Sequence, residues 1–313
     1  MRIKKFNTVF LFFLVSICAY TFAEGNTPPP GKLVEVNGHK LHINCAGNGT
    51  PIVVLESAIG GWSVDWEKVQ PLVAKKTRIC SYDRAGYGWS EPRDEDAVSS
   101  QLIADELHQL FINAQEAGPY LMVGHSLGGL HVQAFVHTYP KEVVGAVLVD
   151  ATHEDVFTWE APTYWNPPKP DVVPPEPEFD LNLIKWTPET RKLIDQSRED
   201  PQWQATTQKE SQGIRDSVLQ LREFDKLPNI PLIVLTAGEE KKLEDYWSPR
   251  DLMWNQLQRD LATLSPRSEH IHVPGSIHYI QLDNPEIVAN SINRIVDITR
   301  KSEKTDVIVK FNQ

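Results

Sequence analysis

Positive charge is scarce in this chain relative to negative charge. Its 313 residues include 31 Lys and Arg against 42 Asp and Glu, which gives a formal net charge of −11. No basic stripe interrupts this excess of acidic residues. Because an acidic surface repels nucleic-acid phosphates and anionic lipid headgroups, the composition argues against nucleic-acid binding and against electrostatic binding to a membrane.

Long apolar runs are also scarce. The run Val9–Ile17 is too short to span a bilayer comfortably. It follows a short basic segment and precedes small residues towards Ala23, which is typical of an export signal over residues 1–23. A retained anchor is the competing interpretation, because residues 18–22 extend the apolar run. We expect an exported protein, periplasmic or secreted, with no stable membrane anchor once the signal is cleaved.

Cysteine is the third scarce feature, with 3 in the whole chain. Removal of the signal would take Cys18 with it and leave Cys45 and Cys80. An exported protein would carry these two residues into an oxidising compartment, where cysteines commonly pair. The alternative is two buried thiols.

The rest of the chain alternates between strand and helix patterns. Asn37-Gly38 between two alternating segments is a strong hairpin signal. Continuous apolar runs at 51–55 and 143–149 are typical of strands buried on both faces. Residues 99–114 place apolar side chains at helical spacing after the capping residue Ser99. Such alternation predicts a mostly parallel sheet with helices on both faces.

Residues 152–228 interrupt this rhythm with a proline-rich stretch followed by helical patterns. The alternation resumes at 231–236, so the interruption is an insertion into one domain. No internal repeat is present. The predicted organisation is a signal at 1–23, a linker at 24–30, a core at 31–151 and 229–302, a cap at 152–228 and a C-terminal tail at 303–313.

The sequence Gly124-His125-Ser126-Leu127-Gly128 separates an apolar run from a helical pattern. This strand, turn and helix match the G-x-S-x-G nucleophile elbow, in which small residues allow a strained turn that exposes the serine hydroxyl. The helix that follows would direct its unpaired N–H groups towards an anion beside that oxygen. In the alternative interpretation, Ser126 merely caps the helix.

A serine hydroxyl needs a base to remove its proton. Among 10 histidines, His278 is the best candidate, because it lies in a loop after the last predicted strand, at the edge where parallel sheets present functional residues. His39 and His42 fall in the hairpin, His108, His131 and His137 fall on helices, and His125 occupies the variable position of the elbow.

Together these segments resemble the α/β-hydrolase family over residues 31–300. The resemblance extends to residues 81–90 and to Gly275–His278, in the family's order. It implies a mostly parallel eight-stranded sheet with helices on both faces and a helical cap inserted after strand six. It also implies that Ser126 is the nucleophile and His278 the general base, later the general acid.

The resemblance further implies an oxyanion hole formed by two backbone N–H groups. Leu127 would supply one, and the loop after 53–55 the other. In that loop Ile59 aligns with the family's donor. Ala58 is an alternative, because this loop departs from the His-Gly start of many relatives.

The acid of the catalytic triad is the hardest member to assign. In most relatives it follows strand seven by an offset that here reaches Lys241, which cannot serve. Asp150 ends strand six, where the haloalkane dehalogenase branch can carry its acid, and is the preferred candidate. The remaining candidates are Glu240, Glu239 and Asp155.

Two further pairings follow from the resemblance and the local sequence. In this fold the second strand lies beside the strand after the first helix, so Cys45 and Cys80 are predicted to form a disulfide. Asp83 and Arg84 are predicted to form an internal ion pair that braces their loop, and the alternative is a charged substrate site.

The predicted function is that of an exported serine hydrolase acting on a small-molecule ester through an acyl-enzyme, with no metal and no cofactor. Thioesters and amides are less favoured substrates. Relatives that form an alkyl-enzyme ester need a carboxylate nucleophile, which serine cannot replace. The alternatives are an acyltransferase using the same serine and a ligand-binding protein without turnover. Cap tryptophans are candidates for an apolar pocket wall or for a cap core: Trp159, Trp165 and Trp186.

Overall fold

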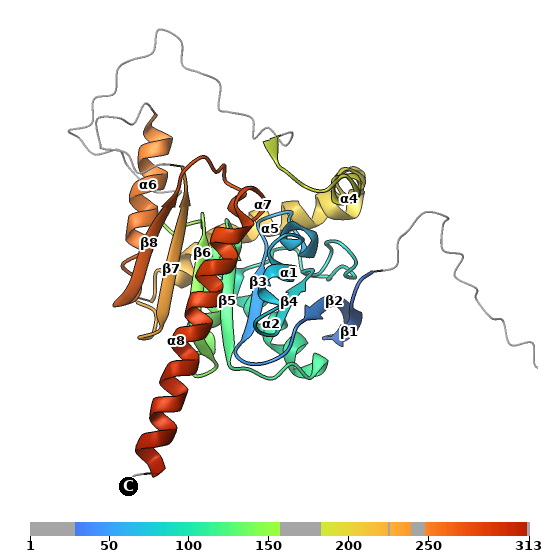
Figure 1. The fold of residues 1–313 in the computed structure, drawn as a ribbon. Helices are drawn as coiled ribbons and strands as arrows, with labels where there is room; N and C mark the ends of the chain where they lie inside the picture. Colours follow the sequence, from blue (N-terminus) through green and yellow to red (C-terminus); the bar gives the residue numbers. More distant parts are fainter. Residues whose placement is uncertain (1–28, 157–182, 225, 239–247, 312–313) are drawn as a thin grey trace, which may run out of the picture.

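A computed structural model describes residues 29–156, 183–224, 226–238 and 248–311, with side chains up to residue 302. At its centre is an eight-stranded sheet with the order β1-β2-β4-β3-β5-β6-β7-β8 (Figure 1). The strands are β1 (Lys32–Val36), β2 (His39–Ala46), β3 (Ile52–Glu56), β4 (Ile79–Tyr82), β5 (Tyr120–His125), β6 (Val143–Val149), β7 (Pro231–Ala237) and β8 (Arg267–Val273). The predicted signal lies outside the described residues.

The helices are a 3₁₀ turn η1 (Ser63–Trp66), α1 (Gln70–Val73), α2 (Ser100–Ala114), α3 (Gly128–Thr138), α4 (Pro188–Glu199), α5 (Pro201–Leu221), α6 (Pro249–Leu261), α7 (Ile280–Asp283) and α8 (Pro285–Phe311). Helix α2 begins as its sequence predicts, because the Ser99 side chain accepts a hydrogen bond from the Leu102 N–H at 3.3 Å. Such capping supplies an acceptor for a backbone N–H group of the first turn, which has no acceptor within the helix itself.

The middle of the sheet is buried on both faces. Alternate residues of β3 belong to separate apolar clusters: Ile52 and Val54 contribute to one, Val53 and Leu55 to the other. The first cluster includes residues of α2, α3 and α6, and the second includes residues of α1 and α8. Strands β3 to β8 pair in parallel, which confirms the predicted fold class.

The antiparallel edge of the sheet is the predicted hairpin. Strands β1 and β2 pair from Lys32↔Ile43 to Val36↔His39. The turn residues Asn37 and Gly38 both have positive φ, 52° and 94°, as a type I′ turn requires. Strand β2 then pairs antiparallel to β4, which attaches the hairpin to the parallel strands.

Helices α4 and α5 belong to the insertion between β6 and β7. They lie towards the end of the sheet where α7 follows β8 (Figure 1). Helix α5 also packs against α2 and α3, which fixes it to the core. Trp186 precedes α4 within the described part of the insertion, whereas Trp159 and Trp165 lie outside the described residues. The predicted helical cap after strand six is therefore present.

The last helix extends into the predicted C-terminal tail. Helix α8 runs from Pro285 to Phe311 and so includes most of residues 303–313. Residues 301–311 contain neither glycine nor proline, so nothing in the sequence stops the helix there. Over the described residues, no helix combines the length and the apolar character that crossing a membrane requires.

Cys45 and Cys80 form a disulfide, as the resemblance implied. They are register partners on the antiparallel strands β2 and β4, with Cα atoms 4.0 Å apart. Cys80 is fully buried and Cys45 is partly buried. The disulfide therefore covalently joins the hairpin edge to the central sheet.

The disulfide is expected to stabilise the fold through the unfolded state. It links residues 35 apart in sequence, and a loop of that length corresponds to about 3–4 kcal/mol in the chain-entropy model. Replacing both cysteines by alanine should lower the free energy of unfolding by about that amount in urea titrations. Reducing agent should destabilise the native protein and leave the double variant unaffected. Two alkylatable thiols in the native protein would contradict the pairing.

Candidate functional site

The candidate nucleophile lies on a tight turn between β5 and α3. Ser126 has φ 53°, in the left-handed region that non-glycine residues rarely adopt. His125 and Leu127 on either side are buried, whereas Ser126 is partly exposed. Strained backbone of this kind costs about 1–3 kcal/mol and persists only where the surrounding structure holds it. The turn thus presents the Ser126 side chain at the surface of a buried segment.

Two glycines allow this turn to pack closely. A Cβ on Gly128 would lie 2.6 Å from the Ser57 carbonyl oxygen and 2.7 Å from that of Glu56. A Cβ on Gly124 would lie 2.6 Å from the Gly128 carbonyl oxygen. Any larger side chain at these positions would push the elbow away from the loop that follows β3. The glycines therefore bring the candidate nucleophile and the candidate oxyanion loop together.

His278 and Asp150 meet through a short hydrogen bond. The His278 Nδ1 atom donates to Asp150 Oδ2 at 2.6 Å. His278 lies in the loop between β8 and α7, and Asp150 directly follows β6 with φ 42°. Asp150 is 3% exposed, and its Oδ1 accepts hydrogen bonds from the Ala237 N–H at 3.1 Å and from Trp254 Nε1 at 3.0 Å. The carboxylate is thus held in place by three donors.

The imidazole of His278 lies next to the elbow. Its ring centroid is 4.7 Å from that of His125, the residue before Ser126. The His125 Nε2–H group donates to the His278 backbone carbonyl at 2.9 Å. Ser126, His278 and Asp150 therefore gather at the carboxyl ends of neighbouring strands, although they lie far apart in sequence.

His125 itself is a supporting residue that its sequence position did not reveal. Its Nδ1 accepts from Gln281 Nε2 at 3.0 Å, so both ring nitrogens are occupied. Burial, followed by the charge of nearby His278, holds the pKa of His125 well below its usual value. The ring is consequently neutral and holds the His278 loop against the elbow. No local sequence signal distinguishes this role from that of an ordinary core histidine.

Trp254 is a second supporting residue that the sequence did not indicate. It lies on α6, and its indole N–H reaches Asp150 across 104 residues of chain. Of the other acid candidates, Asp155 forms an ion pair with Arg222 at 2.5 Å. Glu239 and Glu240 lie outside the described residues. Asp150 is thus the candidate that the described geometry joins to His278.

The two candidate oxyanion donors lie on adjoining segments. Leu127 follows Ser126, and Ile59 lies in the loop after β3, whose last residue Glu56 pairs with Gly124. Among the residues that the structure describes, the backbone N–H groups of Leu127 and Ile59 have no carbonyl acceptor. Both N–H groups are therefore available to an anion near Ser126.

Arg84 braces the oxyanion loop. Its guanidinium donates to the carbonyl oxygens of Ser57 at 2.9 Å and Ala58 at 2.7 Å. It also forms ion pairs with Glu56 at 2.6 Å and with Glu210 of α5 at 2.8 Å. Arg84 is 3% exposed. The clamp joins β3, its following loop and the cap around one buried cation.

The prediction that Asp83 and Arg84 pair with each other is wrong, because each side chain binds other residues. Asp83 instead accepts from the Ser63 N–H at 2.9 Å and the Trp89 N–H at 3.0 Å, and it contacts His42 Nδ1 at 2.9 Å. Consecutive residues leaving a strand point in different directions, so Asp83 and Arg84 reach different neighbours. Both side chains still brace loops, as predicted, and neither is exposed.

The pKa of Glu210 reflects the same clamp. Burial alone would raise it, but the charge of Arg84 and contacts from His131 and Tyr87 lower the pKa to about 2. Glu210 therefore remains an anion at neutral pH and keeps Arg84 paired. Because the folded-state pKa is depressed, this contribution to stability is present above the usual glutamate pKa and is lost only as pH falls towards about 2.

Metal binding has little support among the described residues. Their one group of His, Cys, Asp or Glu atoms close enough to share an ion is Cys45, Cys80 and Glu116. The two cysteines are joined in the disulfide and offer no thiolate. This group is therefore better explained by the disulfide than by a metal.

A family model described as the alpha/beta hydrolase family matches residues 49–291. The chain belongs to this family. Among curated proteins, it is 23% identical over 308 residues to the "probable transporter efuK" of Hormonema carpetanum, covering 85% of this chain and 42% of that protein. A relative from Schizosaccharomyces pombe is 25% identical, and the chain covers 57% of it. The chain thus spans about half the length of these two relatives.

Solved structures of the same fold include enzymes of different chemistry. A putative epoxide hydrolase from Pseudomonas aeruginosa aligns with a TM-score of 0.67 and 16% identity, covering 88% of this alpha/beta hydrolase and 99% of that chain. A thermophilic esterase from Thermogutta terrifontis aligns with a TM-score of 0.54 and 18% identity, covering 86% and 98%. At these identities the likeness establishes the fold, and the choice of chemistry depends on the site.

The Arg84 clamp should make a large contribution to stability. Replacing Arg84 by methionine leaves two buried carboxylates, Glu56 and Glu210, without their cation, and we expect the free energy of unfolding to fall by about 3–5 kcal/mol. Chemical denaturation measures this loss. The matched control is Arg222→Met, which removes an exposed ion pair and should cost about 1 kcal/mol or less. Equal losses in the two variants would contradict a clamping role.

Proposed function

We propose that this alpha/beta hydrolase is a serine hydrolase that cleaves a carboxylic ester through an acyl-enzyme on Ser126. The observation that carries the proposal is the hydrogen bond from His278 to Asp150 beside the strained Ser126 turn. Nucleophile, base and a carboxylate that orients the base are the parts required for acyl transfer. Membership of a hydrolase family also supports a small-molecule substrate.

In the proposed mechanism, His278 Nε2 takes the proton of Ser126 as its oxygen attacks the ester carbonyl. Asp150 holds the Nδ1–H tautomer and stabilises the imidazolium that forms. The N–H groups of Leu127 and Ile59 stabilise the oxyanion, at about 3 kcal/mol per donor. His278 then protonates the leaving alcohol. A water molecule, deprotonated by His278, then attacks the acyl-enzyme and releases the acid.

Serine at the elbow supports ester cleavage over epoxide opening. Epoxide opening through an alkyl-enzyme ester needs a carboxylate nucleophile whose ester is then hydrolysed. A serine would instead form an ether, which the same water attack could not hydrolyse. The solved epoxide hydrolases of this fold therefore support the architecture of the site and not its chemistry.

Export belongs to the same proposal. The basic and then apolar pattern of residues 1–23 supports it, and so does the Cys45–Cys80 disulfide, because disulfides persist in oxidising compartments. Peptide mass mapping of the protein purified from its native host would show whether residues 1–23 are removed.

A fluorophosphonate probe tests the nucleophile directly. We expect labelling at Ser126, identified by peptide mass, and loss of labelling in Ser126→Ala. His278→Ala should abolish turnover of 4-nitrophenyl esters and reduce labelling about a hundredfold or more, because the hydroxyl then lacks its base.

Asp150→Asn should reduce kcat by about 10⁴-fold, as expected when the base loses its orienting carboxylate. The control is Ser276→Ala, which removes a hydroxyl from the same loop and leaves all three proposed catalytic side chains in place.

The same assays distinguish the alternatives. Product analysis with an added alcohol acceptor would reveal an acyltransferase by its new ester. Absence of both labelling and turnover in the folded protein would contradict the proposed hydrolase and favour a binding protein on this fold. Full activity in Asp150→Asn would show that Asp150 is not the acid.

Trp254 should affect turnover through Asp150. Trp254→Phe preserves an aromatic ring but removes the donor to Asp150 Oδ1. A hydrogen bond to a charged group contributes about 1.5–3 kcal/mol, so we expect kcat for a 4-nitrophenyl ester to fall by about tenfold or more with little change in KM. Unfolding curves of the variant provide the control for stability. Unchanged kcat would exclude a role for this donor in orienting Asp150.

A further inference from the structure

A pocket lies between the cap and the candidate oxyanion loop, with an empty volume of about 380 Å³ that includes its mouth. Its lining comes from three parts of the chain: Ile59 and Gly60 from the loop, Trp186 and Arg198 from the cap, and Tyr279 from the loop after β8. Ile59 is a candidate oxyanion donor and Tyr279 directly follows His278. The pocket therefore adjoins both halves of the proposed reaction centre.

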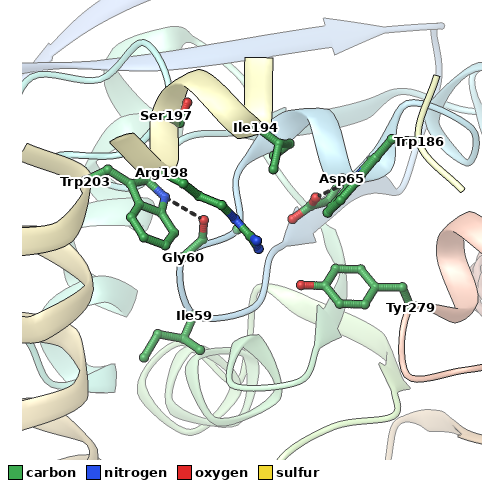
Figure 2. A pocket seen from close by; sticks show the side chains of 10 residues that line it. Ile59, Gly60, Asp65, Trp186, Ile194, Ser197, Arg198, Trp203 and Tyr279 are labelled. Atoms are coloured by element: carbon green, nitrogen blue, oxygen red, sulfur yellow. Dashed lines mark hydrogen bonds between the residues drawn. The ribbon is translucent and has the colours of Figure 1, made fainter. Parts of the chain in front are cut away.

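The side chain of Arg198 extends its positively charged guanidinium group into this pocket. Figure 2 shows its side chain extending from α4 into the space between Gly60 and Asp65, with the Tyr279 hydroxyl opposite. Its guanidinium carbon lies 6.0 Å from the centre of the Trp203 ring. In the described part of the chain, no carboxylate lies within ion-pair distance of this guanidinium. Asp65 is the nearby carboxylate that feels the charge of Arg198, and because the two form no ion pair, the guanidinium is available to a ligand.

Asp65 presents a second polar group to the same pocket. It is 1% exposed, and its Oδ1 accepts from Trp186 Nε1 at 3.2 Å. Its Oδ2 is buried and, among the described residues, has no hydrogen-bond partner. Buried polar atoms are nearly always satisfied, so an unsatisfied one beside a pocket indicates a group that the ligand supplies.

The charge of Asp65 depends on pH near neutrality. Burial raises the pKa of its carboxyl to about 7, against the lowering effects of the hydrogen bond from Trp186, of the nearby Trp62 backbone and of the charges of Arg198 and Arg84. Tyr279, which also faces Asp65, is neutral because burial and the charge of Asp65 raise its pKa. Below about pH 7, Arg198 is therefore the charged lining residue, and the Asp65 O–H can donate a hydrogen bond.

We propose that this pocket is an anion subsite that binds a free carboxylate on the ester substrate, with Arg198 as the cation and Asp65 as a hydrogen-bond donor. The assignment rests on the proposed hydrolase function and narrows its substrates to esters carrying a carboxylate, such as half-esters of dicarboxylic acids. Guanidinium matches carboxylate geometry with two parallel N–H donors. The aromatic walls formed by Trp186, Trp203 and Tyr279 suit the apolar spacer between the carboxylate and the ester.

The test compares matched substrates at pH 6. Mono-4-nitrophenyl esters of glutaric, adipic and pimelic acids are paired with neutral 4-nitrophenyl alkanoates of equal chain length, and the ratio of their kcat/KM values is measured. We expect the wild type to prefer the anionic member of at least one pair, and Arg198→Gln to reduce that ratio at least tenfold. The matched control is Arg222→Gln, in the same insertion but paired with Asp155 outside the pocket lining. It should leave the ratio unchanged.

The pH dependence tests the role of Asp65. As pH rises through about 7, ionised Asp65 offsets the charge of Arg198, so the preference for the anionic ester should fall several-fold. Asp65→Asn cannot ionise and should keep the preference constant from pH 6 to pH 8.5. Any pH effect on the chemical step common to both substrates of a pair cancels in the ratio.

The outcomes separate the subsite from the proposed activity. Ester turnover with no anionic preference, or with equal ratios in wild type and Arg198→Gln, would overturn the subsite and leave the hydrolase intact. If no ester is cleaved, calorimetry of adipate with the full-length protein decides the subsite independently. Binding that weakens at least tenfold in Arg198→Gln supports it, and no detectable binding overturns it.

Discussion

Two left-handed turns at the ends of neighbouring strands hold each other in place, and the geometry of the site depends on them. Ser126 follows β5 and Asp150 follows β6, with φ of 53° and 42°. The Ser126 N–H donates to the Val149 carbonyl at 3.2 Å, and the Thr152 N–H donates to the Ser126 carbonyl at 2.8 Å. The Ser126 turn is thus hydrogen-bonded to the chain on either side of the Asp150 turn. The parallel register, which pairs His125 with Val149, makes this arrangement possible.

Local patterns predicted those parts of the molecule that local physics determines. The Asn37-Gly38 hairpin, the buried strands and the turn at Ser126 each follow from a short run of residues with a specific backbone requirement. His278 could be selected because a loop after the last parallel strand must reach the functional edge of the sheet. The disulfide needed one further step, since only knowledge of the strand order brings Cys45 beside Cys80.

The contacts that the sequence did not predict join residues through tertiary packing. Trp254 reaches Asp150 from α6. Arg84 reaches Glu210 in the insertion, and no sequence periodicity determines the path of that insertion. Periodicity identifies which face of a helix is buried but not which polar atom it meets.

The cap contributes to the core as well as to the pocket. Helix α5 supplies Glu210 to the Arg84 clamp, and that clamp holds the carbonyl oxygens of Ser57 and Ala58. With these carbonyls held, the following Ile59 N–H remains without a carbonyl acceptor among the described groups. A movement of α5 would therefore disturb the oxyanion loop directly. The cap and the proposed catalytic geometry are mechanically coupled through one buried guanidinium.

The neutrality of His125 is a necessary condition for this site. Its ring lies 4.7 Å from that of His278, which the proposed mechanism protonates during each cycle. A second cation at that distance in a buried environment would oppose this protonation. Burial keeps His125 uncharged, and its Nε2–H still anchors the His278 carbonyl. Burial prevents His125 from acting as a base. It also suits His125 to hold the His278 loop in place, because the neutral ring adds no charge beside that loop.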